Sequence, residues 1–499
     1  MDFSTRLLSE EDKAKIRLAV QLHTPIEVIS YTLPKTKEMY IYEVLTVFLA
    51  ECHQEHMTDN LCFCLGELLT NSKKANTKRI YFKENNLDIN NEMDYHQGMV
   101  TFKDDMLNNL EHYLKAQEKA GLYVKLILQL YDDGVKIEIR NNSVLTIFEQ
   151  KRINEKLRAS RKYTDPKQVI SRVIDQTEGA GLGIIIIVLM LQKIGLSQEN
   201  YKVFSSEDET ITQMLLPLNE EVNKNMNTLY EEFVKNLNTI PVFDETLAAF
   251  KSLAENSGTK DDDLVDFICK DVTLASVILK ESALQGQSCS KLSEAFSVLG
   301  KEKVIQLLSA DNKGIRTIQK KDDIRRFWDH EYDVAYYAFN LAQNYNKRNS
   351  DLPLDTETVY VGALLHDIEC LLLEVATDEQ KEAVKKISDT MENGDKVYNL
   401  FLKDFGHSIG CYMLAQKWGL PQTVAQVIHY HNNPDNAPEE LLQLVYIVYL
   451  ADILQYYKQK KVEFYQINKN VRKWFNIENK KQLDSIVSKM EKGLSKIKN

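Results

Sequence analysis

The sequence lacks the patterns that mark disulfide scaffolds, zinc ribbons and membrane proteins. Its seven cysteines among 499 residues are odd in number and scattered, and no two of them form a CxxC pair. The apolar run at 184–191 is far shorter than the roughly 18 residues of a membrane-spanning helix. The first residues are charged where a signal peptide would be apolar. We therefore expect a cytoplasmic protein that does not enter a membrane.

The chain also lacks an excess of positive charge. It has 62 lysines and arginines against 73 aspartates and glutamates, a net charge of −11. This balance disfavours nucleic acid and anionic membranes as general partners. Hydrophobic residues make up 43% and charged residues 27% of the chain, as is usual for folded proteins. A chain of this length is expected to form two to four domains.

Two kinds of local pattern divide the sequence. Apolar residues at helical spacing run from the N-terminus through about residue 76, and strand-like segments rich in β-branched and aromatic residues follow. Asp132-Asp133-Gly134 predicts a hairpin turn between two of these strands. From residue 240 onward the strand signals nearly vanish and helical periodicity continues to the end. The expected strands are 78–82, 123–131, 135–140, 201–206 and 210–218.

Three polar residues in the first half fall on one helical face. Glu67, Asn71 and Lys74 are spaced i, i+4 and i+7. A carboxylate, an amide oxygen and an ammonium together suit Mg²⁺ and phosphate, because Mg²⁺ prefers hard oxygen ligands and the cation neutralises phosphate charge. Taken alone, the pattern is more typical of a solvated polar stripe, which is the norm on amphipathic helices.

A glycine-rich segment precedes an apolar helix later in the same half. Gly179, Gly181 and Gly183 would let backbone amides approach a phosphate, and the helix dipole would favour the anion. A Rossmann site is the rival interpretation. The context disfavours it, because the glycines follow a long polar stretch rather than a strand.

Taken together, these motifs resemble the GHKL ATPase domain of sensor histidine kinases. ELLTNSKKAN (67–76), IEIRNNS (137–143), EGAGLGI (178–184) and ETITQMLLPL (209–218) resemble its N, G1 and G2 boxes and closing strand, in the family's order. The resemblance covers about residues 45–220. It implies a layered fold with a mixed sheet and helices on one face, binding ATP and Mg²⁺.

The resemblance also implies roles for individual residues. Asn71 would hold Mg²⁺, Glu67 would act catalytically by positioning or activating water, and Lys74 would contact phosphate. Asn141 stands where the family has an aspartate that accepts a hydrogen bond from adenine, and Ser143 replaces a glycine, so adenine binding would be weaker. The glycines that would line the phosphates are Gly179, Gly181 and Gly183, and residues 144–178 would form a mobile lid.

A phosphoacceptor histidine of the histidine-kinase type is not evident. His23 directly precedes Thr24-Pro25 instead of standing four residues before Thr-Pro as the family motif requires. His53 and His56 lie on the entry helix without that motif. Autophosphorylation on histidine is therefore not expected.

Histidines and aspartates gather in the helical second half. Imidazole and carboxylate groups spread over several helices are what a metal-assisted phosphohydrolase uses to hold ions and activate water. The structural alternative, that they cap helices and satisfy one another, is equally compatible with the sequence. The candidate ligands are His330, His366, Asp367, His407, His431 and Asp452.

The segments around these residues resemble the HDOD domain, a relative of the HD phosphohydrolases found in bacterial signalling proteins. The resemblance covers about 237–457 and implies an all-helical module. Phosphodiesterases of the HD kind carry the motif HDIGK, whereas this chain has HDIEC at 366–370. Where those enzymes have two adjacent histidines, this chain has His431 followed by Asn432. A transition-metal site could persist, but hydrolysis would lack the lysine and one ligand.

Overall, the sequence predicts an α+β protein, with a GHKL-type domain followed by an HDOD domain. The leading functional prediction is a signalling protein that binds ATP and relays its state to a protein partner through a non-catalytic HDOD module. The alternatives are a kinase acting on a partner protein, a metal-dependent phosphohydrolase and a scaffold; homodimer formation is left open. The predicted segments are a helical entry at 1–44, the ATPase domain at 45–220, a helical connector at 221–236, the HDOD domain at 237–457 and a Lys-rich helical tail at 458–499.

Overall fold

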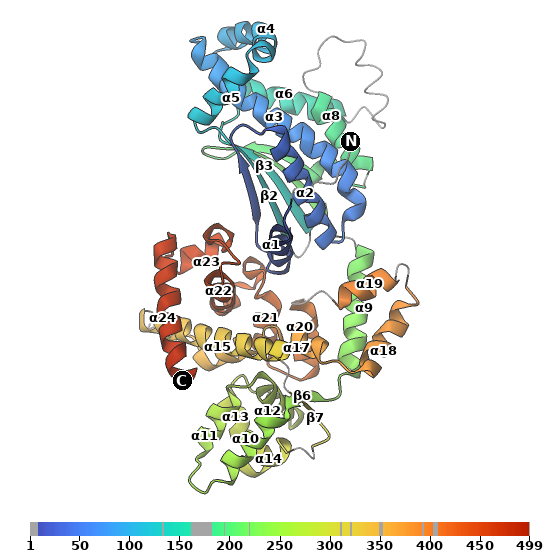
Figure 1. Ribbon diagram of the computed structural model, residues 1–499, viewed down its shortest axis with the longest axis vertical. Coiled ribbons are helices and arrows are strands. Elements are labelled where there is room, and N and C mark those ends of the chain that lie inside the picture. The colour runs from blue at the N-terminus through green and yellow to red at the C-terminus, as the bar shows by residue number, and fades with distance from the viewer. Residues whose placement is uncertain are drawn as a thin grey trace. The chain divides into compact units, whose positions relative to one another are not determined.

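The computed structural model divides the chain into two compact units, Met1–Asn219 and Glu220–Asn499, coloured blue to green and green to red in Figure 1. Each unit is described by itself. The structure describes residues 8–131, 134–160, 182–193, 195–218, 220–309, 312–319, 322–348, 353–391, 394–402 and 408–498.

The first unit is built on a five-stranded sheet with the strand order β1-β2-β3-β5-β4. All four strand pairs are antiparallel, so the expectation of a mixed sheet was wrong. Tyr131 and Gly134 are paired across the β2–β3 hairpin, which confirms the predicted turn position. The strands are β1 (Ile26–Ser30), β2 (Val124–Tyr131), β3 (Gly134–Asn141), β4 (Tyr201–Ser205) and β5 (Thr210–Pro217).

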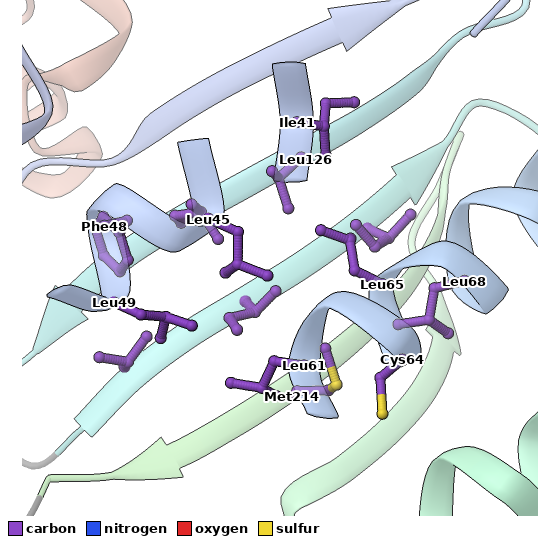
Figure 2. Packing of buried hydrophobic residues seen from close by; sticks show 14 of the residues in the cluster. Ile41, Leu45, Phe48, Leu49, Leu61, Cys64, Leu65, Leu68, Leu126 and Met214 are labelled. Carbon is purple, nitrogen blue, oxygen red and sulfur yellow. The ribbon is translucent and has the colours of Figure 1, made fainter. Parts of the chain in front are cut away.

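Helices cover one face of this sheet and form its core. Apolar residues alternate along β2 and β3, so one face is apolar and the other carries charges such as Glu138. Figure 2 shows side chains of α2 and α3, spaced three or four residues apart, lying on that apolar face. The helices of this unit are α1 (Glu10–Gln21), α2 (Lys35–Glu51), α3 (Thr58–Glu84), α4 (Glu92–Asn108), α5 (Leu110–Lys119), α6 (Ile147–Ser160) and α8 (Leu182–Lys193).

Two local predictions in this unit were wrong. Residues 78–82 continue α3 instead of forming a strand, because Ile80, Tyr81 and Phe82 pack against α4 and α5 in a second small core. Residues 26–30, expected to be helical, form the edge strand β1. Tertiary packing outweighs strand propensity at 78–82, whereas residues 26–30 are rich in β-branched residues and pair with β2 as their local propensity favours.

The second unit is largely helical. Contrary to the all-helical expectation, it contains a short parallel pair of strands, β6 (Ile240–Phe243) and β7 (Ile315–Ile318). Its first eight helices are α9 (Glu220–Asn236), α10 (Asp244–Glu255), α11 (Asp261–Ile268), α12 (Val272–Leu284), α13 (Leu292–Leu299), α14 (Lys301–Leu307), α15 (Asp322–Arg348) and α16 (Thr356–Leu364). The remaining helices are α17 (Ile368–Glu374), α18 (Asp378–Ser388), α19 (Gly394–Phe401), α20 (Ser408–Lys417), α21 (Gln422–Tyr430), α22 (Leu442–Lys458), α23 (Lys469–Trp474) and α24 (Lys480–Lys498).

The helices at the two ends of this unit are packed, not extended. The predicted connector is α9, which packs against α18, α19 and α20, and Lys417 of α20 donates hydrogen bonds to carbonyls at its C-terminal end. In the Lys-rich tail, Leu483 and Met490 of α24 are buried. Tyr337 of α15 also donates a hydrogen bond to Glu491 of α24. Among the described residues, no helix is both long and apolar enough to cross a membrane.

Candidate metal centre

Four parts of the helical unit bring histidines and aspartates together. His330 lies in α15, and His366 and Asp367 lie in the turn between α16 and α17. His431 ends α21 as its C-cap, and Asp452 lies in α22. The long helix α15 packs against α16 and α22, and α16 also packs against α21 and α22. Helix packing therefore makes a single cluster of residues that are up to 122 positions apart (452 − 330).

Asp367 occupies a position where an aspartate side chain normally caps the N-terminus of a helix. It is the N-cap of α17, yet its side chain makes no capping hydrogen bond. N-cap aspartates usually accept a hydrogen bond from the first-turn amides, which stabilises the helix by about 1 kcal/mol. The Asp367 carboxylate instead faces the histidines, so its position favours the cluster over the cap.

The distances within the cluster are short enough for its side chains to share a metal ion. Asp452 Oδ1 lies 3.2 Å from His330 Nε2 and 3.6 Å from His366 Nε2. The two oxygens of Asp367 face different rings: Oδ2 lies 3.6 Å from His366 Nε2, and Oδ1 lies 3.3 Å from His431 Nε2. Ligand atoms of His330, His366 and Asp367 all fall within 4.8 Å of one another.

Main-chain carbonyls orient two of the imidazole rings. Nδ1 of His366 lies 2.8 Å from the Ala363 carbonyl oxygen, and Nδ1 of His431 lies 2.6 Å from the Ile428 carbonyl oxygen. A carbonyl oxygen only accepts, so each Nδ1 carries the hydrogen, and in the neutral ring the Nε2 lone pair is free. Both Nε2 lone pairs consequently point at carboxylate oxygens, the tautomer found when histidine binds a metal through Nε2.

The side chains of the cluster differ in their exposure to solvent. The side chains of His366 and His431 are 0% and 1% exposed, whereas those of Asp367 and His330 are 16% and 18% exposed. Among the described residues, the polar contacts of the five side chains come from histidines, carboxylates and main-chain carbonyls, and none from lysine or arginine. The contacts of the cluster therefore favour a cation over an anion.

Mutual contacts set the charges in this cluster. Burial alone lowers the pKa of His366, but the carboxylates of Glu331 and Asp367 outweigh burial and raise the pKa well above its ordinary value. Burial alone raises the pKa of Asp452, but His330 and His366 outweigh it and hold the pKa below its ordinary range. Protons and a metal ion would thus compete for the same ring nitrogens.

The donor set fits a divalent transition metal. Nε2 of His330, His366 and His431 and the Oδ1 atoms of Asp367 and Asp452 are buried and make no hydrogen bond among the described residues. Leaving such atoms unpaired is costly, and a cation bound by His330, His366 and Asp367 would lower that cost. Imidazole with carboxylate suits zinc, iron or manganese.

The sequence identified most of this cluster. Five of the six predicted metal residues lie together, and the sixth, His407, falls outside the described residues. At the positions where the resemblance places glycine and lysine, the side chains of Glu369 and Cys370 are buried. The Glu369 carboxylate lies against Gly410, where a Cβ atom would come within 1.8 Å of Glu369 Oε2.

One member of the cluster was missed. Glu331 is fully buried, and its Oε2 atom lies 3.0 Å from Nδ1 of His366. Its only sequence signal is that it follows His330, which does not separate it from the many acidic residues on helix surfaces.

The predicted nucleotide residues take different positions in the first unit. Along α3, Asn71 and Lys74 are exposed and Glu67 is half-buried, so all three are available on one face of the helix. The apolar helix α8 packs against α3. Gly183 lies in its first turn, whereas Gly179 and Gly181, and most of the predicted lid, lie outside the described residues.

The side chain of Asn141 makes hydrogen bonds within the first unit. It is 3% exposed, and its Nδ2 donates hydrogen bonds to Ser143 Oγ at 2.6 Å and to Asn76 Oδ1 at 3.3 Å. Ser143 also donates to Asn76 Oδ1. The side-chain amide of Asn141 therefore links α3 to the end of β3.

Comparison with known proteins places the helical unit in a family. Residues 240–434 match the HDOD domain, which confirms the resemblance over that range. An uncharacterised protein from Treponema pallidum is 35% identical over 477 residues, covering 95% of this chain and 92% of the relative.

Solved structures resemble part of the chain. The MmoQ response regulator of Methylococcus capsulatus shares 16% identity, with 46% of this chain and 88% of that chain covered and a TM-score of 0.36. An HDOD domain protein of unknown function from Geobacter sulfurreducens shares 18% identity, with 55% of this chain and 96% of that chain covered and a TM-score of 0.25.

Proposed function

Because this chain belongs to the same family as the uncharacterised Treponema pallidum protein and carries an HDOD domain, we propose that it is a signalling protein whose HDOD domain holds a divalent transition metal. One observation carries the proposal: main-chain carbonyls hold Nδ1 of His366 and His431, and the Nε2 atoms of these rings face buried carboxylate oxygens that have no hydrogen-bond donor among the described residues. A bound cation would supply the missing positive charge.

A regulatory role suits this centre better than phosphodiester hydrolysis. A bound metal could supply a Lewis acid and an activated water, but a phosphate substrate also needs cations to hold its negative charge. Within the part of the chain that the structure describes, the contacts of the five clustered side chains include no lysine or arginine. Cys370 stands where the resemblance places the lysine of catalytic relatives. The metal would therefore control the packing of its helices, and a protein partner would detect that packing.

Metal analysis of the purified full-length protein tests this proposal. We expect about one or two equivalents of zinc, iron or manganese per chain in the wild type and a loss of most of it in His366→Ala. His112→Ala is the matched control, because that imidazole is 58% exposed, pairs with Glu84 and lies in the first unit, whereas the cluster lies in the second. Wild-type protein that carries no more metal than His366→Ala after reloading would overturn the proposal.

A phosphodiesterase assay on the same samples separates the two metal-dependent functions. Hydrolysis of a model phosphodiester by metal-loaded wild type, lost in His366→Ala and kept in His112→Ala, would establish a phosphohydrolase instead. Metal binding without turnover is the expected result.

A second proposed activity is nucleotide binding by the first unit. It is supported by the exposed pair Asn71 and Lys74 on the same face of α3 as Glu67. In calorimetry with ATP and Mg²⁺, we expect the wild type to bind and Asn71→Ala to lose at least about tenfold in affinity, because it removes a metal ligand. Asn108→Ala, an exposed asparagine on α4, is the control. No heat of binding in the wild type would remove this activity.

A further inference from the structure

Glu331 and its neighbour His330 lie on opposite sides of the His366 imidazole ring. Adjacent residues on a helix point about 100° apart, so α15 can present both. His330 lies toward Asp452 and toward the Nε2 side of His366, with the two ring centroids 5.5 Å apart. Glu331 approaches the same ring from behind, with Oε2 3.0 Å from Nδ1. His366 therefore lies between a predicted ligand and a carboxylate.

The surroundings of Glu331 are unusual for a carboxylate. Its side chain is 0% exposed, and neither of its oxygens has a hydrogen bond among the described residues. A buried carboxylate without donors is costly unless positive charge is close. The nearest such group is the His366 ring, whose Nδ1 hydrogen already points to the Ala363 carbonyl. A ring that donates its lone pair to a cation gains positive character, which Glu331 would stabilise.

We infer that Glu331 is a positioning residue of the metal centre: together with the Ala363 carbonyl, it keeps the hydrogen on Nδ1 of His366 and leaves Nε2 for the metal. The inference rests on the proposed metal-binding function and goes one step further. The Ala363 contact is made by the main chain and survives any side-chain substitution, whereas the Glu331 contact depends on one carboxylate. Removing that carboxylate lowers the preference for one tautomer without removing a ligand.

Metal affinity of three variants of the full-length protein tests the inference. Glu331→Leu fills the buried space but removes the carboxylate, and Glu331→Gln keeps an acceptor without charge. By the usual effect of such supporting groups, we expect the dissociation constant for Co²⁺ to rise about 10- to 100-fold in the leucine variant and less in the glutamine variant. The control is Asp329→Asn on the same helix, whose side chain is 57% exposed and pairs with Arg325; its affinity should not change.

The absorption spectrum of bound Co²⁺ adds a measurement that a purely structural role would not alter. We expect the leucine variant, saturated with Co²⁺, to show a changed visible spectrum because His366 no longer binds reliably through Nε2, and the glutamine variant to restore the wild-type spectrum. Leucine and wild-type proteins with equal affinity and the same spectrum would overturn the inference. Wild-type protein that binds no Co²⁺ would overturn the proposed function itself, so the two failures are distinguishable.

Discussion

Replacing Glu149 with glutamine is expected to destabilise the first unit by about 3 kcal/mol at neutral pH. Glu149 lies in the first turn of α6 with its side chain 8% exposed, and it pairs with Lys78 at 2.8 Å and Arg79 at 2.6 Å. Its Oε2 also accepts a hydrogen bond from the Thr146 amide. The glutamine would leave two largely buried cations of α3 without their carboxylate.

The same group predicts how stability depends on pH. Burial alone raises the pKa of Glu149, but Arg79 and Lys78 outweigh burial and bring the pKa to about 2. A lowered pKa in the folded state means that the stabilisation is fully present above the ordinary value of 4.5 and is lost as the pH falls from there toward 2. The glutamine variant should lack this dependence.

The two units need separate measurements, because a chain of two units need not unfold in one step. All three tryptophans, Trp328, Trp418 and Trp474, belong to the second unit. Their fluorescence therefore reports that unit alone, while hydrogen exchange of peptides from 124–141 in rising urea reports the first. We expect Glu149→Gln to shift the exchange and leave the fluorescence transition unchanged.

The matched control removes an exposed ion pair of the same kind. Glu111 pairs with Lys115 at 2.7 Å, but the two side chains are 84% and 74% exposed, and such pairs contribute little. Glu111→Gln should therefore leave the exchange the same as in the wild type. If the two variants behaved alike, the buried pairing of Glu149 would not hold α6 to α3.

The residues of the candidate metal centre could be predicted because histidine and aspartate side chains are characteristic metal ligands. Imidazole and carboxylate groups such as His330, His366 and Asp367 made a metal site one of two interpretations that the sequence supports equally, the other being helix capping and mutual pairing. Glu331 was not predictable, because acidic residues are common on helices and only its burial distinguishes it. What sets it apart is the packing of α15 on α16, which no local pattern specifies.

Strands could be predicted from the sequence where apolar residues alternate strongly. The prediction failed where tertiary packing determines the secondary structure. Val124–Tyr131 and Gly134–Asn141 carry alternating apolar residues and a turn between them, and both form strands. Residues 78–82 have equally strong strand preference, yet they complete an aromatic core in which Tyr81 packs edge-on against Phe102. That neighbour comes from α4, which local preference cannot anticipate.

Binding of a divalent metal is expected to raise the thermal stability of the helical unit strongly, and Asp452→Ala should abolish that rise. The ligands come from α15, the α16–α17 turn, the end of α21 and α22, so one ion would cross-link helices that are distant in sequence. A ligand that binds only the folded state at 100 times its dissociation constant adds about 2.7 kcal/mol.

Asp452 is the most informative position for this experiment, because its Oδ1 contacts both His330 and His366. Its replacement by alanine removes the group that joins α22 to the other ligands. Tryptophan fluorescence during heating, with and without Mn²⁺ or Zn²⁺, measures the effect in this unit. Asp329→Ala, which removes an exposed carboxylate of α15, should retain the full metal-dependent rise. An equal rise in both variants would mean that the ion binds elsewhere, since only one of them has lost a member of the cluster.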